Sequence, residues 1–293
     1  MKSLFAPIRK SLNPGTHRRR VRTGNGAEQS VPYLLRLPPS HEPNYPTAVV
    51  LLLGDKVENI FRKRGWEDRA DRVGFVVLAL EDTRPEAVRA ACEDLQTLAK
   101  PDPARFFLFG NECPLAIPGM PAVAALAGTG ATEPTKELVR FASGEPMEKW
   151  DARVLWEFFD HNPRRLRPPV ATRLVVRVSG LRNDRGTVPI TVYRGAEGFG
   201  DPYKALTGDT VRIRGDWAEA TFSNLPPDDY AVLLLHDDNA NGKMDTSFGY
   251  PQEGFGASNN PKPRFGPPTF EDTRFYLAGD TPERRVVIRM VYL

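Results

Sequence analysis

The secondary structure that this sequence predicts changes character at a short segment rich in proline and arginine. The segment, N-P-R-R-L-R-P-P-V (162–170), favours extended backbone because proline fixes φ. Before it, short apolar runs alternate with helical patterns, whereas after it helical patterns are absent. A chain of 293 residues is long enough for two hydrophobic cores. We therefore predict two domains, 31–161 and 172–293, joined by a linker over 162–171.

The first predicted domain is of the α/β class. Two segments have helical patterns, 61–72 and 85–99, and the second begins with a proline. Short apolar runs predict strands at 33–37, 48–53, 74–80, 106–109 and 122–127. Strands that alternate with helices favour a mostly parallel sheet with helices on its faces, so we expect a three-layer domain.

The second predicted domain is all-β. Seven short segments alternate apolar with polar side chains, at 174–178, 188–193, 210–214, 218–222, 230–235, 273–277 and 285–292. Glycine, asparagine, aspartate and proline fill the gaps, as is typical of an antiparallel β-sandwich with Greek-key connections. The run N-L-P-P-D-D-Y-A-V predicts a turn into a central strand, with Tyr230 at the corner.

Residues 1–30 are basic and weakly patterned, because seven lysines and arginines precede the first acid, Glu28. We predict a disordered, solvated tail in preference to an RNA- or lipid-binding arm. The apolar stretch 3–8 is short and interrupted by Pro7, so no export signal is expected in this sequence. No apolar run approaches the ~18 residues of a membrane span, and a net charge of +3 does not indicate a nucleic-acid partner. The composition predicts a soluble protein.

A candidate metal site follows the predicted strand 230–235. Asp237, Asn239, Asn241 and Asp245 form the pattern D-x-N-x-N-G-x-x-D, in which Gly242 allows a sharp turn. Alternating side-chain oxygens can surround one hard cation. Because every ligand is an oxygen, the pattern favours calcium over zinc. We expect weak affinity, nearer ~10⁻⁴ M than the affinity of cytosolic buffers, since two of the ligands are amides.

This loop departs from a helix-loop-helix calcium site, because Phe248 stands where the bidentate glutamate belongs and a strand leads in. Glu253 is the candidate that completes the ligand set, with Glu271 or Asp272 as further candidates. The alternative is a loop without metal, in which each Asp or Asn side chain caps its own backbone.

Further side chains around the loop have candidate roles. His236 is predicted either to be a structural histidine or to donate to an acid of the loop and so orient a metal ligand. Aromatic side chains recur through the loop and its return, and they predict either a small hydrophobic cluster or a platform for a carbohydrate or other polymer: Phe248, Tyr250, Phe255, Phe265 and Phe270.

Several motifs of the first domain resemble α/β-hydrolases of the polyhydroxybutyrate-depolymerase and feruloyl-esterase type. They are Y-L-L-R-L-P-P-S, A-V-V-L-L-L-G, G-W-E-D-R-A-D-R-V-G-F-V-V-L, D-P-A-R-F-F-L-F-G and the closing W-E-F-F-D-H-N-P-R. The resemblance covers about residues 31–164 and implies a truncated hydrolase-like fold.

The catalytic residues that the resemblance implies are missing. Leu53-Gly54 replaces the His-Gly of the oxyanion region, and in the nucleophile turn Glu112 replaces the serine and Pro114 the second glycine. Cys113 with His161 is the remaining candidate pair, but no base is placed near this thiol by the sequence. The resemblance therefore predicts a non-catalytic relative of these enzymes.

The second domain is similar to domain of unknown function 2141, a bacterial family. The shared motifs are L-x-V-x-V-S-G-L-R-N-D-R-G, the run from F-S-N-L-P-P to N-G-K-M-D, P-Q-E-G-F-G-A-S-N-N and F-G-P-P-T-F-E-D-T-R-F. The resemblance implies a β-sandwich and an envelope setting, with no agreed activity. Asp229 departs from the glycine that the family favours there.

Together these patterns predict a non-catalytic binding or scaffold protein with a calcium-ordered loop. An ester hydrolase with an unrecognised site and a structural protein without metal are the two alternatives.

Overall fold

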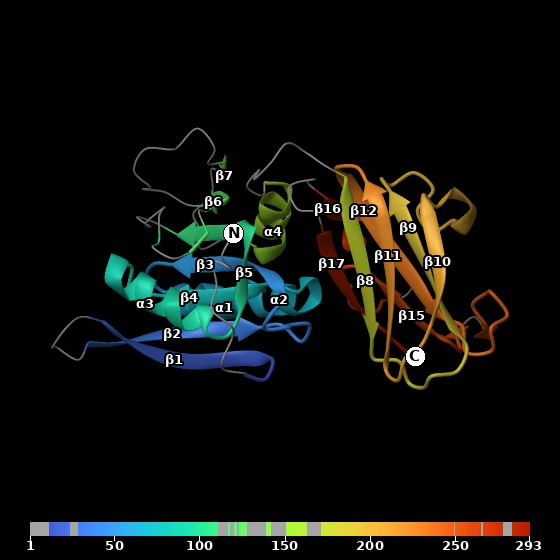
Figure 1. The fold of residues 1–293 in the computed structure, drawn as a ribbon, viewed down its shortest axis with the longest axis horizontal. Coiled ribbons are helices and arrows are strands. Elements are labelled where there is room, and N and C mark those ends of the chain that lie inside the picture. The colour runs from blue at the N-terminus through green and yellow to red at the C-terminus, as the bar shows by residue number, and fades with distance from the viewer. Residues whose placement is uncertain are drawn as a thin grey trace. The chain divides into compact units, whose positions relative to one another are not determined.

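The computed structural model describes residues 12–23, 29–110, 117, 120–121, 123–127, 139–141, 151–162, 171–248, 250–264, 266–277 and 283–293. The chain divides into two compact units, Met1–Leu166 and Arg167–Leu293 (Figure 1). The division falls inside the segment predicted to be a linker. The first unit is α/β and the second is rich in β-strands.

The first unit is built on a seven-stranded sheet in the order β1-β2-β4-β3-β5-β6-β7. The first two pairings in this order are antiparallel and the other four are parallel. The strands are β1 (Gly15–Thr23), β2 (Gln29–Leu37), β3 (Pro46–Leu53), β4 (Val76–Leu80), β5 (Lys100–Gly110), β6 (Ala125–Ala127) and β7 (Val139–Phe141). The centre of the sheet is thus parallel, as predicted; β7 was not predicted.

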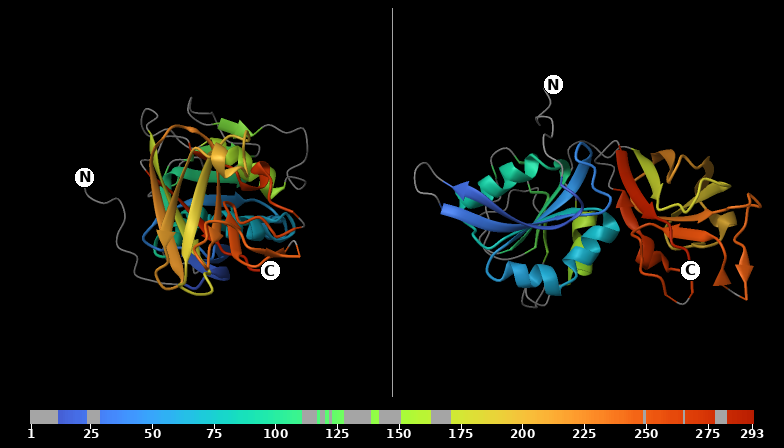
Figure 2. Two further views of the ribbon diagram at one scale, coloured as in Figure 1. Left: turned by 90° about the vertical axis from the view of Figure 1, so that its right-hand side faces the viewer. Right: turned by 90° about the horizontal axis from the view of Figure 1, so that it is seen from below.

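Helices cover both faces of this sheet (Figure 2). On one face α3 (Pro85–Gln96) packs on β-strand side chains such as Leu51 and Leu78. On the other face lie α1 (Val57–Lys63), α2 (Trp66–Val73) and α4 (Ala152–His161). The ring of Trp156 in α4 stacks on Phe75 with centroids 4.1 Å apart. None of the helices in the described part of the chain is long and apolar enough to cross a membrane.

The helix predicted over 61–72 is wrong in its bounds, because two helices occupy this region. Gly65 lies between them with φ of 79°, a left-handed conformation that ends α1 and begins α2. Glycine adopts this conformation without the steric cost that a Cβ atom brings. The apolar period continues across the break, and for that reason the pattern indicated a single helix.

The predicted tail over 1–30 is also wrong in part, because residues 15–23 form β1 and pair with β2 along their whole length. The arginines alternate in exposure, so Arg18 and Arg20 face solvent while Val21 is buried. Arg19 donates two hydrogen bonds to the carboxylate of Asp94 in α3, at 2.6 and 2.9 Å. The density of basic residues concealed a period-two pattern that is typical of an edge strand.

The second unit contains two larger sheets and a small hairpin. One sheet has the order β10-β9-β12-β15, with β16 also paired to β12, and the other has the order β11-β8-β17. The strands are β8 (Thr172–Ser179), β9 (Thr187–Arg194), β10 (Thr207–Arg212), β11 (Trp217–Leu225), β12 (Asp228–His236), β15 (Gly254–Ala257), β16 (Phe275–Leu277) and β17 (Glu283–Arg289). The hairpin is β13 (Thr246–Ser247) with β14 (Tyr250–Pro251), and two short helices are η2 (Pro202–Lys204) and α5 (Phe270–Thr273).

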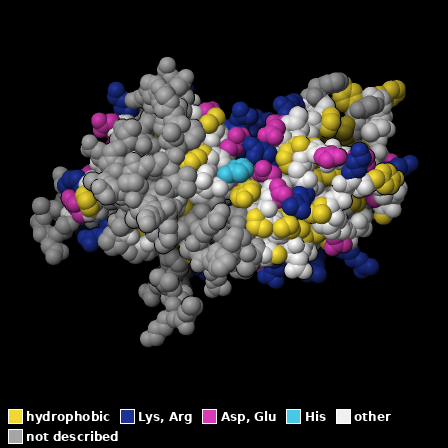
Figure 3. All heavy atoms as spheres, turned by 90° about the horizontal axis from the view of Figure 1, so that it is seen from above, with side chains coloured by type: hydrophobic (Ala, Val, Ile, Leu, Met, Phe, Trp, Pro, Cys, Tyr) yellow, Lys and Arg dark blue, Asp and Glu magenta, His cyan; other side chains and the backbone are white. Residues whose placement is uncertain are grey.

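Side chains from both sheets form one core, which includes Val176, Val192 and Ile288. Tyr230 is buried in it, and its hydroxyl donates to the carbonyl of Pro226 at 2.8 Å, so the tyrosine lies at the predicted corner. The prediction of a wholly antiparallel domain is wrong at one pairing, since β17 runs parallel to β8. Among the side chains visible in Figure 3, basic and acidic groups are interspersed.

Candidate cation-binding loop

The candidate loop begins where β12 ends, and it closes where His236 pairs with Gly254 of β15. Its first residue, Asp237, is held by two backbone hydrogen bonds to Thr187, at 2.9 and 3.0 Å. The side chain of Asp237 is buried, and its two oxygens accept the N–H groups of Asn241 and Gly242 at 3.0 and 2.7 Å. Gly242 has φ of 79°, which suits glycine and gives the loop its sharp turn. The carboxylate of Asp237 therefore shapes the turn.

Two asparagine side chains of the motif converge on the carboxylate of Asp245. The amide nitrogens of Asn239 and Asn241 donate to its two oxygens at 2.6 and 2.9 Å. The oxygens of the same amides accept backbone N–H groups, those of Asn241 and Lys243, both at 3.0 Å. The loop thus brings the four predicted ligands together, and each amide oxygen keeps a second lone pair.

Glu253 braces the loop from its far side. The side chain is 4% exposed, and its two oxygens accept the N–H groups of Asp238 and Asp245 at 2.9 and 3.0 Å. Each oxygen thereby accepts one backbone N–H of the loop. The other two candidates for completing a ligand set interact elsewhere, since Glu271 binds Arg274 and Asp272 caps α5.

Asp238 was missed by the sequence pattern, because it lies between two ligand positions but its side chain pairs with arginines outside the loop. It binds Arg182 at 2.9 Å and Arg185 at 3.2 Å. Burial alone raises the pKa of Asp238, but the hydrogen bonds from Arg182 and Asn183 and the charge of Arg185 outweigh it and lower the pKa. The ionised carboxylate therefore ties the loop to the segment that joins β8 to β9.

Within the described residues no group of three or more His, Cys, Asp or Glu side chains lies together as a set of metal ligands. A cation here would depend on Asp245 together with the side-chain oxygens of Asn239 and Asn241, which now accept backbone N–H groups. Carboxylate and amide oxygens suit a hard divalent cation, and calcium accepts such irregular sets.

Residues 176–284 match the family described as uncharacterized protein conserved in bacteria (DUF2141). The resemblance of the second half to this family is confirmed. The match runs from within β8 to the start of β17 and includes the whole loop from Asp237 to Glu253. A search of curated proteins found no match.

Solved structures that are similar to the chain include two esterases and an isopeptidase. The esterase domain from a Rhodothermus marinus protein has 21% identity and a TM-score of 0.28, with 39% of this chain and 49% of that chain covered. The AtxE2 isopeptidase has 17% identity and a TM-score of 0.28, with coverage of 41% and 24%. The esterase LipW from Mycobacterium marinum has 15% identity and a TM-score of 0.27, with coverage of 42% and 46%. The chain spans less than half the length of each.

In the DUF2141 segment, His236 does not touch the acids of the motif. It is fully buried, its Nε2 donates to the carbonyl of Arg185 at 2.9 Å, and its Nδ1 accepts from the hydroxyl of Tyr292 at 2.7 Å. Its Nε2 lies 4.0 Å from Asp238. The histidine therefore holds the base of the loop in place, and the predicted orientation of a ligand acid is wrong.

In the segment that matches DUF2141, the described aromatic side chains of the predicted platform do not all face solvent. Phe270 is buried and its ring contacts Phe199 with centroids 5.6 Å apart, because α5 turns it inward. Phe255 is partly buried in β15, and Phe265 lies outside the described residues. Phe248 and Tyr250 are exposed on the β13–β14 hairpin.

Most residues of the predicted nucleophile turn lie outside the described residues, including Glu112, Cys113 and Pro114. His161 ends α4, and its Nδ1 bonds the carbonyl of Glu157 in the same helix at 2.8 Å. The other cysteine, Cys92, is buried, and burial raises the pKa of its thiol to about 12. That thiol is unsuited to nucleophilic chemistry.

Proposed function

We propose that the chain is a non-catalytic binding protein whose β-rich unit carries a calcium-ordered loop. One observation carries the proposal: Asn239 and Asn241 both reach Asp245, while Asp237 and Glu253 fix the backbone between them. A binding loop that is largely formed before its ion arrives loses little conformational entropy on binding. We also propose that the two sheets form a Greek-key sandwich, a fold that presents such loops at its ends.

Calcium would replace the two amide N–H groups that now satisfy Asp245. The carboxylate would then bind the ion directly, and the amide oxygens would join it through their free lone pairs. The ion adds positive charge beside Asp237, Asp245 and Glu253, whose carboxylates lie within one short loop. With one half-buried carboxylate and two amides as direct ligands, the affinity expected is weak, ~10⁻⁴ M.

The alternative is a loop that functions without metal, and the hydrogen bonds described above favour it as well. Asx-turns formed by Asp237, Asn239 and Asn241 satisfy the backbone on their own. The two readings differ in their response to calcium, because only an ion that binds the folded state shifts the unfolding equilibrium.

Calcium should raise the melting temperature of the full chain's β-rich unit, measured by hydrogen exchange of residues 172–293 during a thermal ramp. At ten times Kd the expected stabilisation is about 1.4 kcal/mol, or roughly 4–8 °C. Magnesium at the same concentration should do less, since it demands a tighter octahedral set. A melt that stays flat to about 5 mM calcium would leave the loop as a metal-free turn.

We further expect no ester hydrolysis, because Glu112 occupies the position of the nucleophile. Short-chain nitrophenyl esters should show no turnover above that of the double variant Cys113→Ala, His161→Ala. Activity that disappears in this variant would establish the hydrolase alternative.

We propose a carbohydrate or other polymer as the ligand. The proposal is supported by the exposed rings of Phe248 and Tyr250. Retention on insoluble polysaccharide should fall when both are replaced by serine, and unchanged retention would remove this class.

A further inference from the structure

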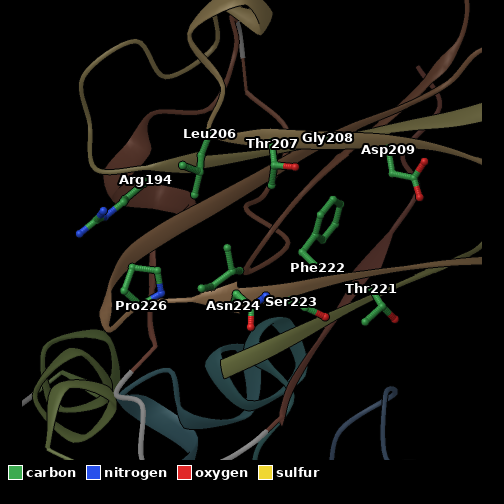
Figure 4. Close-up of a pocket in the computed structure, with 11 residues that line it drawn as sticks. Arg194, Leu206, Thr207, Gly208, Asp209, Thr221, Phe222, Ser223, Asn224 and Pro226 are labelled. Atoms are coloured by element: carbon green, nitrogen blue, oxygen red, sulfur yellow. The ribbon is translucent and has the colours of Figure 1, made fainter. Parts of the chain in front are cut away.

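A second candidate site lies at an open edge of the β-rich unit, between β10 and β11. It is a cleft of about 460 Å³, and Figure 4 shows strand residues on its two sides. One side is formed by Thr207, Gly208 and Asp209 of β10, and the other by the five consecutive residues 221–225 of β11. No residue of the candidate loop, 237–253, lines this cleft.

The lining shows that the cleft runs along strand edges. Successive side chains of a strand point to opposite faces, so consecutive residues line one cavity only where the strand's edge faces it. Both strands are the last in their sheets, since among the described strands β10 pairs with β9 alone and β11 with β8 alone. A short turn joins them at the bridge between Arg214 and Trp217. The cleft is therefore a slot between two open sheet edges.

One edge donor lies beside the slot, on the residue that follows the lining residue Asp209. The N–H of Thr210 bonds the side chain of Asp209 at 2.8 Å, and the residue across from it on β9 is Pro189, which has no N–H. A pair that contains proline cannot exchange both ladder hydrogen bonds, so Thr210 takes a non-hydrogen-bonded position whose N–H points away from β9. The carboxylate of Asp209 takes the place that a neighbouring strand would fill. On the β11 side the register shifts between Phe222 and Leu225, and Asn224 has φ of 62°. This bulge interrupts the pairing of β11 with β8 along the slot.

The slot carries an unbalanced negative charge. Arg194 at its rim is paired with Asp228 at 2.7 Å. Asp209 makes no ion pair with any other described residue. An occupant with a lysine or arginine side chain next to Asp209 would balance this charge.

We propose that the slot binds a free, extended polypeptide segment that adds a strand between β10 and β11 and carries a basic side chain beside Asp209. Strand addition takes its affinity from main-chain hydrogen bonds and its specificity from alternate side chains. A second copy of this chain fits less well. Its free β10 edge carries the same aspartate, so pairing two such edges about Asp209 would bring two carboxylates together.

The test uses the full chain and a labelled peptide probe, T-R-L-V-V-R-V-S, the sequence of β8, which already pairs with β11 on its other edge. Fluorescence anisotropy measures binding, and hydrogen exchange locates it. We expect new protection within residues 207–225. A peptide with prolines in place of the two central valines should not bind, and one with glutamates in place of its arginines should bind at least about tenfold more weakly.

Two variants of the chain complete the design. Thr210→Pro removes the edge donor, and Asp209→Asn removes the charge while leaving an oxygen for the Thr210 N–H. Each should weaken the probe about fivefold or more, whereas the exposed Asp184→Asn should not. Absence of binding to the native chain would contradict the proposal and would mean that the charge of Asp209 only prevents other strands from pairing with this edge. Protection elsewhere, or affinity unchanged in Asp209→Asn, would overturn the proposal, as would a concentration-dependent dimer of the native chain that this variant abolishes.

Discussion

Replacing Gly186 with alanine should destabilise the β-rich unit by about 3–5 kcal/mol, because the added methyl group would make the shortest contact found at any described glycine. A Cβ atom at this position would lie 1.8 Å from the carbonyl oxygen of Asp237 and 2.8 Å from the carbonyl carbons of Asp237 and Asp238. All three are backbone atoms, so no side-chain rotation relieves the clash. Gly186 also has φ of 68°, which strains an L-residue.

The same substitution displaces the start of the candidate loop, since Thr187 and Asp237 exchange their two backbone hydrogen bonds beside it. Gly195→Ala is the matched control, with φ of 71° and no atom within 4 Å of the added Cβ. It should cost only about 1–2 kcal/mol, the strain of the backbone alone. Urea unfolding followed by hydrogen exchange of residues 172–293 measures both. Equal losses would show that contact with the loop is not the cause.

Removing Glu253 is the second large perturbation, and we expect Glu253→Ala to cost about 2–4 kcal/mol in the presence of a chelator. The buried carboxylate accepts the N–H groups of Asp238 and Asp245, and alanine leaves both without a partner. Hydrogen bonds to a charged acceptor are worth more than neutral ones, and buried donors left unpaired add a desolvation cost. The loop should also exchange its amide hydrogens faster.

Two further variants separate bracing from charge. Glu253→Gln keeps the length and one acceptor, so it should lose about half as much stability. Glu271→Ala removes an exposed acid of α5 whose partner is Arg274, the residue that follows this helix, and it should change stability by about 1 kcal/mol or less. A loss as small for Glu253→Ala as for Glu271→Ala would contradict the assignment of Glu253 as a brace.

The sequence predicted those parts of the fold that depend on local pattern. Continuous apolar runs located β3, β4 and β12, which lie inside their sheets and are buried along most of their length. The edge strand β1 was missed, because the side chain of its residue Arg19 binds Asp94, which lies 75 residues away in the sequence. The break at Gly65 was missed because the hydrophobic period runs through it while the backbone does not.

The candidate site divides in the same way. Four ligand positions were predicted together because they lie within nine residues, and short-range spacing determines how such a loop folds. The roles of Glu253 and His236 depend on contacts with residues that approach only in the folded chain. Asp238 pairs with Arg185 and Arg182, which lie 53 and 56 residues away, and no local sequence pattern predicts that pairing.

The central claim is that a calcium ion binds at Asp245, and calorimetric titration of calcium into the chelator-stripped full chain tests it directly. Asp245→Asn is the informative variant, whereas Asp237→Asn would place an amide N–H against the N–H groups of Asn241 or Gly242 and disturb the turn itself. Asp216→Asn, exposed in the turn between β10 and β11, is the charge-matched control. We predict one site per chain with Kd ~10⁻⁴ M, kept in Asp216→Asn and lost in Asp245→Asn. No heat of binding in the native chain, or equal binding by Asp245→Asn, would contradict the account.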